Sequence, residues 1–266
     1  MFSFCSSISS LDLSSFNTEN VKNMHQMFYS CQKLNYLNIS SFKTTNVENM
    51  EQMFSSCQDL KSLNLKNFDV AKVTSMSGMF SFCSSLTSLD LSSFKTVQVE
   101  NIRLMFYGCY SLSFLDISNF DTSKIVSMDR LFTSCFSLTS LDISHFKTEN
   151  VEIMTSLFES NSLLTSLELS NFVTNKVTQM DRMFLNCTSL TSLNLLSFLG
   201  NALISATGMF KDCHKLTSID LSNFEAKPSQ IGSMLQNCYS LEYLKIPKLS
   251  TDETRGLNIY LKIEIY

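Results

Sequence analysis

The chain has 266 residues, of which 44% are hydrophobic and 17% charged, and its net charge is −4 with a pI near 5.4. This apolar content is enough to bury a continuous core. The weak negative charge and the lack of a basic run give no electrostatic reason to expect binding to nucleic acid or to an anionic membrane. Apolar runs of only a few residues argue against a membrane-inserted helix in this segment.

A 26-residue unit repeats along almost the whole chain. One copy, MFSFCSSLTSLDLSSFKTVQVENIRL, occupies residues 79–104, and a Met or Leu recurs at the same step from Met1 to Met209, before a shortened step to Met234. A fixed period of this length is typical of solenoids. We predict one solenoid over residues 1–249, with nine repeats and a partial tenth, followed by a polar linker and strand-like tail at 250–266.

The first half of each repeat alternates apolar and polar residues. In the copy above, Leu89 and Leu91 flank Asp90, which is the period of a β-strand. Stacked in the same phase, these segments predict a parallel sheet whose side chains point alternately to the core and to solvent.

The second half spaces its apolar residues at steps of three and four. In the first copy they are Val21, Met24, Met27, Phe28 and Cys31. This spacing predicts an amphipathic helix. A threonine precedes the helix in most copies and is expected to cap its N-terminus; these residues are Thr18, Thr44, Thr96, Thr122, Thr148 and Thr174.

The two halves together predict an α/β solenoid. We expect a curved stack of about ten strand–turn–helix units with the parallel sheet on the concave face, because helices need about 10 Å between neighbours and strands about 4.8 Å. Two phenylalanine rows and two methionine positions recur with the period and are expected to form the core.

All nine cysteines occupy one repeat position, and Asn161 fills that position in the seventh copy. No CxxC pair is present, so a zinc site is not expected, and neither is any cofactor. We interpret the cysteines as buried free thiols. On the helical side, successive cysteines would lie beyond the roughly 7 Å Cα separation that a disulfide tolerates.

The spacing L-x-x-L-x-L at Leu86, Leu89 and Leu91 resembles a leucine-rich repeat, although Phe94 stands where an asparagine or cysteine is usual. The fuller phrase LTSLDLSSFKT…V…M…MF..C resembles the BspA-like leucine-rich repeat surface proteins, in particular the DUF285 or mycoplasma-lipoprotein type, over about residues 1–249. The resemblance implies a solenoid at the cell surface or outside the cell, used for adhesion or protein contact, and it supplies no catalytic residues.

The N-terminus lacks the basic start and apolar stretch of a secretory signal. We expect the sequence to be a piece of a longer protein, so a cytoplasmic location stays open beside the surface location that the resemblance implies.

The outward strand positions are the candidate partner-binding surface. They include consecutive acidic residues, which either form a solvated stripe or bind a cation or a basic partner: Asp90, Asp116, Asp142 and Glu168. Four residues interrupt the flanking serine rows and are either aromatic or charged anchors or sequence drift: Tyr36, Lys66, Phe114 and Tyr243.

The sequence favours a non-enzymatic binding or adhesion solenoid with an unidentified protein partner. The alternative is a structural spacer within a longer chain, with no specific ligand of its own. An enzyme is not expected, because no catalytic triad and no Gly-rich phosphate loop are present and the three histidines share no repeat position.

Overall fold

The computed structural model describes residues 1–247, so the predicted tail at 250–266 lies outside the described residues. The chain divides into two compact units. Unit 1 comprises Met1–Ile125 and Leu131–Leu138, and unit 2 comprises Val126–Arg130 and Thr139–Tyr266. Each unit is a parallel β-solenoid, and one 26-residue turn of it is called a coil below.

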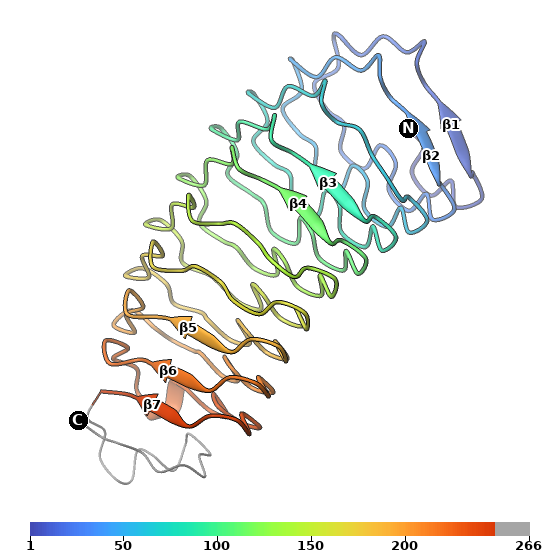
Figure 1. Cartoon of the computed structure of the whole chain (residues 1–266). Helices are drawn as coiled ribbons and strands as arrows, with labels where there is room; N and C mark the ends of the chain where they lie inside the picture. Colours follow the sequence, from blue (N-terminus) through green and yellow to red (C-terminus); the bar gives the residue numbers. More distant parts are fainter. Residues whose placement is uncertain (248–266) are drawn as a thin grey trace. The chain divides into compact units, whose positions relative to one another are not determined.

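Unit 1 contains two pairs of short parallel strands (Figure 1). β1 (Ser10–Asp12) pairs with β2 (Tyr36–Asn38), and β3 (Ser88–Asp90) pairs with β4 (Phe114–Asp116). Equivalent repeat positions lie opposite each other, as Leu11 does with Leu37 and Leu89 with Leu115. The parallel sheet and its register, which the alternating leucines predict, are therefore confirmed.

Unit 2 continues the same arrangement. β5 (Ser192–Asn194), β6 (Ser218–Asp220) and β7 (Tyr243–Lys245) form a three-stranded parallel sheet. A short 3₁₀ turn, η1 (Pro228–Gln230), is the one helical segment among residues 1–247. The predicted helices are thus wrong. The coils have a series of turns in their place, and among residues 1–247 short strands occur in the coils that carry β1–β7.

The turn side of each coil, residues 18–31 in the first, shows why the helix prediction failed. The amide of Met27 donates to the carbonyl of Met24, and the amide of Cys31 donates to that of Phe28, each at 3.2 Å. Gln26 and Ser30, at the third position of these turns, have φ of 53° and 59°, which is the geometry of type II turns. Successive four-residue turns bring apolar residues inward every three or four positions, as a helix does.

Hydrogen bonds between coils replace the bonds within a helix. The amides of Met24, Gln26 and Phe28 donate at 2.9 Å to carbonyls of the next coil, namely those of Asn49, Glu51 and Met53. Neighbouring coils are therefore bonded on the turn side as well as on the strand side, with the β-ladder spacing of about 4.8 Å on both. The prediction that the sheet lies on a concave face assumed that helices hold the coils farther apart on the opposite side. That assumption is wrong, because the opposite side is not helical. The sheet side is therefore called the strand face below.

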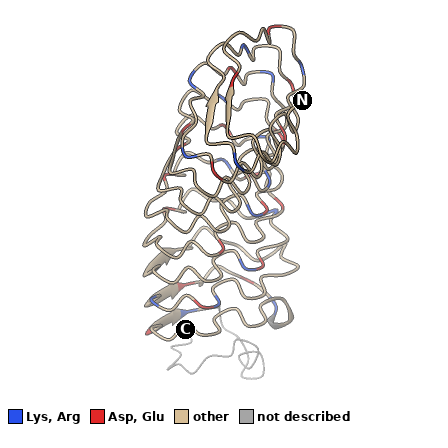
Figure 2. Cartoon of the chain, turned by 90° about the vertical axis from the view of Figure 1, so that its right-hand side faces the viewer, with Lys and Arg blue, Asp and Glu red and all other residues tan. Residues whose placement is uncertain are grey.

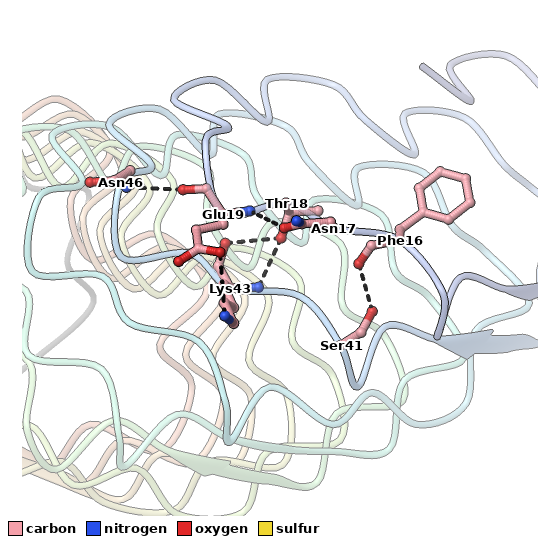
Figure 3. A network of polar contacts seen from close by, with 7 residues as sticks. All are labelled: Phe16, Asn17, Thr18, Glu19, Ser41, Lys43 and Asn46. Carbon is pink, nitrogen blue, oxygen red and sulfur yellow. Dashed lines mark hydrogen bonds and ion pairs between the residues drawn. The ribbon is translucent and has the colours of Figure 1, made fainter.

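The threonines predicted as helix caps bridge neighbouring coils instead. The Thr18 hydroxyl donates to the carbonyl of Lys43 at 2.9 Å and accepts the Lys43 amide at 2.8 Å (Figure 3). Thr148 makes the same pair of bonds with Val173. These hydroxyls are buried, and a buried hydroxyl needs such partners.

The core consists of stacked identical side chains. In unit 1, rings from Phe2 to Phe132 stack on the equivalent ring of the next coil, with centroids 5.6–5.9 Å apart. In unit 2 the row Phe158, Phe184 and Phe210 stacks at 5.5 and 5.3 Å. The methionines at the inward turn positions are almost fully buried except Met1 and Met27 in the first coil, so the predicted core is confirmed.

All nine cysteines are free thiols, and seven of them are fully buried. From Cys31 onward, each thiol donates to the carbonyl of the Phe in the coil before it, at 3.0–3.2 Å. Asn161, in the cysteine position of the seventh copy, is also buried and donates its Nδ2 to the Phe158 carbonyl at 2.8 Å. The predicted buried thiols are confirmed, although the distance argument against disulfides was wrong because it assumed helices.

Candidate functional site

The strand face is formed by the outward side chains of β1–β7 and of the equivalent positions in the other coils. The inward leucines and isoleucines fix it, because a one-residue slip would place them in water. The predicted site residues fall into two sets by unit. Unit 1 carries Tyr36, Lys66, Asp90, Phe114 and Asp116, and unit 2 carries Asp142, Glu168 and Tyr243.

The row of acidic residues has a structural use that the sequence analysis missed. Each side-chain oxygen accepts the backbone amide two residues later: Asp90 from Ser92 at 3.1 Å, and Asp116 from Ser118 at 3.0 Å. Asn38 and Asn64 do the same in their coils, at 3.2 Å. These are Asx turns, which need an oxygen and no charge. The alternation of Asp, Asn and Glu in this row was the signal for them.

The same kind of hydrogen bond lowers the pKa of three carboxylates in this row. The hydroxyl and the amide of Ser92 lower the pKa of Asp90, and those of Ser144 and Ser170 lower the pKa of Asp142 and of Glu168. The Ser92 and Ser144 hydroxyls lie 2.6 and 2.7 Å from their carboxylates. In these three coils a carboxylate with a lowered pKa therefore accepts the hydrogen bonds that close the end of the strand segment.

Lys66 pairs with this row. Its Nζ lies 3.8 Å from Asp90 Oδ2 in the next coil, and both side chains are well exposed. Lys245 pairs with Asp220 at 3.5 Å in the same way in unit 2. Exposed pairs of this kind contribute little to stability, so they mainly reduce the negative charge of the row locally.

Two aromatic residues give the strand face of unit 1 its largest apolar contacts. Tyr36 on β2 is 53% exposed and Phe114 on β4 is 56% exposed, and both stand where most coils have serine. Three coils separate them, which is about 14 Å at β-ladder spacing. In unit 2, Tyr243 on β7 holds the same position and is 43% exposed.

A second aromatic group in unit 1 was missed by the sequence analysis. Tyr107 lies 4.7 Å from Phe82, and Tyr110 stacks on Phe136 at 5.1 Å, measured between ring centroids. Gly108, at φ 73°, leaves room for Phe82, whose Cδ1 lies 2.7 Å from where a Cβ would be. Aromatic residues in slots that are serine in other copies were the available signal.

Charge does not gather into one patch on either unit (Figure 2), since lysines, arginines and acidic residues are interspersed along the coils. Within residues 1–247, no three His, Cys, Asp or Glu side chains meet in a group suited to a metal ion. The same residues contain no helix with the length and apolar character needed to span a membrane.

Three solved structures are similar to this chain at low sequence identity. A leucine-rich repeat protein from Bacteroides ovatus is 20% identical with a TM-score of 0.44, covering 100% of this chain and 79% of its own. A leucine rich cell surface protein from Faecalibacterium prausnitzii is 18% identical with a TM-score of 0.36, covering 88% and 78%. A leucine-rich repeat protein from Leptospira interrogans is 15% identical with a TM-score of 0.32, covering 89% and 67%.

The sequence comparison is more specific than the structural one. No curated protein sequence matches the chain. In contrast, one family model, described as "Mycoplasma protein of unknown function, DUF285", matches four overlapping segments: residues 1–114, 79–193, 111–224 and 164–251. These matches cover nearly all of the repeats, and the chain therefore belongs to the DUF285 family of leucine-rich-repeat-like proteins.

Proposed function

We propose that this protein is a non-enzymatic protein-binding module, used in adhesion at the cell surface, and that the strand face is its contact surface. The observation that carries the proposal is the exposure of Tyr36 and Phe114 by more than half, in positions that are serine in most coils. Exposed aromatic residues on an otherwise polar face are typical interface anchors.

The different roles of the side chains on the two sides of a coil support the strand face as the contact surface. The turn side uses its inward side chains for the core and its amides for bonds between coils. The strand face has short polar side chains whose replacement disturbs no inward packing. The side-chain oxygens of Asp90 and Asp116 already hold a backbone amide of their own coil, so the proposal assigns specificity to the aromatic residues: Tyr36 and Phe114 in unit 1 and Tyr243 in unit 2. The charge around them is set by the remaining residues of the face, which are Lys66, Asp90, Asp116, Asp142 and Glu168.

The surface location is supported by the resemblance of the repeat phrase to BspA-like surface proteins. It is tested by adding a protease to intact cells that produce the full-length protein. Digestion of the solenoid in intact cells supports the proposal, whereas protection until the cells are lysed contradicts it.

The binding role is tested by capture of cell-surface proteins on immobilised wild-type chain and on a double variant, Tyr36→Ser and Phe114→Ser, which gives these coils the serine of their neighbours. The matched control is Leu163→Ser, which removes an exposed apolar residue outside the strand face. Loss of a captured protein in the double variant alone supports the proposal. Equal capture of a specific protein by all three would contradict the role of the two aromatic residues as anchors, and the absence of any specific capture favours the spacer alternative.

A further inference from the structure

A cavity of about 230 Å³ opens in unit 2 at the corner that follows β6. It is lined by Leu199, Gly200, Asn201, Ser222, Asn223 and Glu225. The lining combines polar and apolar surface in similar amounts and includes one carboxylate. This corner is separate from the aromatic residues of the strand face, so what it binds is independent of the proposed function.

The cavity occurs where the threonine bridge is interrupted. In the preceding coil, Thr174 holds both backbone groups of Leu199, accepting its amide at 2.7 Å and donating to its carbonyl at 3.1 Å. Gly200 replaces the threonine in the next coil, and a Cβ there would lie 2.9 Å from the carbonyl carbon of Glu225. The backbone of the following coil therefore occupies the space of the missing side chain, and no hydroxyl ties Glu225 in place.

The chain turns sharply at this point. The Ala226 amide donates to the Phe224 carbonyl two residues before it, at 2.9 Å, which is a three-residue turn. In the first coils, by contrast, the threonine bridge holds the residue equivalent to Glu225, as Thr18 holds Lys43. The corner at Gly200 thus lacks the threonine bridge, and the cavity lies at this corner.

Three side chains that line the cavity, Ser222, Asn223 and Glu225, carry hydrogen-bond acceptors. The Asn223 Nδ2 donates to the Leu196 carbonyl at 2.8 Å, which leaves its Oδ1 available. The Ser222 hydroxyl donates to Asp220. Burial raises the pKa of that carboxyl, but the bonds from Ser222 and the neighbouring Lys245 together lower it below its usual range. Glu225 is exposed, and among residues 1–247 its carboxylate forms no ion pair or hydrogen bond.

We propose that this cavity binds a guanidinium group, such as the side chain of an arginine on a partner protein. A planar guanidinium offers five N–H donors and no acceptor, which matches a carboxylate beside amide and hydroxyl oxygens. An ammonium group would satisfy the charge of Glu225, but as a compact point charge it would reach fewer of these acceptors at once.

The test is a titration of the ¹⁵N-labelled chain with ethylguanidinium, followed by NMR. We expect the amide signals of Gly200 and Asn201 to shift with a dissociation constant of about 1–10 mM, the range for so small a ligand. Glu225→Gln should weaken the binding at least about fivefold, because it removes the charged acceptor. The control Glu152→Gln, which neutralises another exposed carboxylate of unit 2, should leave it unchanged.

Methylammonium, titrated in parallel, distinguishes the two cations. Weaker shifts with methylammonium at the same ionic strength support guanidinium recognition. The proposal is overturned if Gly200 and Asn201 do not respond to ethylguanidinium, if Glu225→Gln binds as well as the wild type, or if methylammonium binds equally.

Discussion

The two sides of a coil use the same backbone bonding and differ in what their side chains are free to do. On the turn side, Met24, Phe28 and Cys31 are buried and the intervening Gln26 and Ser30 take positive φ. On the strand face, every second side chain points to solvent and is replaced between copies without loss of the inward leucines. The turn side therefore specifies the architecture, while the strand face can vary between copies, and this freedom is why we propose it as the contact surface.

The largest expected difference between the two sides concerns phenylalanine. Phe106 is fully buried between stacked rings, whereas Phe114 is 56% exposed on β4. Phe106→Ala should lower the free energy of unfolding by about 3–5 kcal/mol through lost burial and a cavity. Phe114→Ala should change it by no more than about 0.5 kcal/mol. Urea unfolding of both variants measures this difference, and similar losses would show that the strand face is also structural.

Alkaline pH should destabilise the protein through the turn-side thiols. Burial raises the pKa of Cys135 and Cys187 to about 12, whereas a thiol in an unfolded chain ionises near 8.5. The stabilising contribution of these protonated thiols is fully present below about pH 8.5 and is lost as the pH rises toward 12. For each thiol, the unfolding equilibrium constant should grow by about tenfold per pH unit in this window.

This pH effect is measured by urea unfolding under reducing conditions across the window, for the wild type and for Cys135→Ala and Cys187→Ala. Each substitution should make the pH dependence shallower by about one proton. Tyrosines and lysines titrate in all three proteins, so the difference reports on the thiol. Parallel pH profiles would contradict the buried, protonated state of these cysteines.

A smaller effect is expected at the threonine bridge. Thr148→Val keeps the shape of the side chain and leaves the amide and carbonyl of Val173 without their hydroxyl partner, which should cost about 1–3 kcal/mol. Thr165→Val, at an exposed position of the strand side, should cost less than about 0.5 kcal/mol. Thermal unfolding compares the two variants, and equal stabilities would refute a structural role for the bridge.

The smallest effect separates charge from hydrogen bonding in the acidic row. Asp90→Asn keeps an acceptor for the Ser92 amide and loses only the exposed pair with Lys66, so it should cost at most about 0.5 kcal/mol. Asp90→Ala removes the acceptor as well and should cost about 1 kcal/mol. If both variants are equally destabilised, the carboxylate charge matters and the Asx turn does not.

Sequence reasoning reached the repeat, the strand register and the buried rows of Phe, Met and Cys, because strict periodicity translates directly into stacking. It failed at Val21–Cys31, since two consecutive turns and a helix place apolar residues at the same spacing. A signal was present in the residues before Met and Cys, where Gly78, Gly108 and Gly208 occupy positive-φ positions. Glycine destabilises the interior of a helix, whereas it favours a turn position with positive φ, so its occurrence at these two recurring positions indicates turns.

The candidate site was only partly predictable for a different reason. Tyr36 and Phe114 could be selected from the sequence, because most other copies have serine at their repeat position. In contrast, the hydrogen bonds of Asp90 depend on the local backbone conformation, which a repeat pattern does not give. The shape of the corner at Gly200 depends on the path of the next coil, which the pattern does not give either.

The non-helical turn side is the central claim, and NMR assignment of the Cα chemical shifts over residues 76–83 tests it most directly. We predict extended or turn-like shifts at Met76, Met79 and Phe80, broken by left-handed values at Gly78 and Phe82, whose φ are 59° and 57°. A continuous run of helical shifts from Val73 to Cys83 would contradict the account and restore the strand–turn–helix repeat.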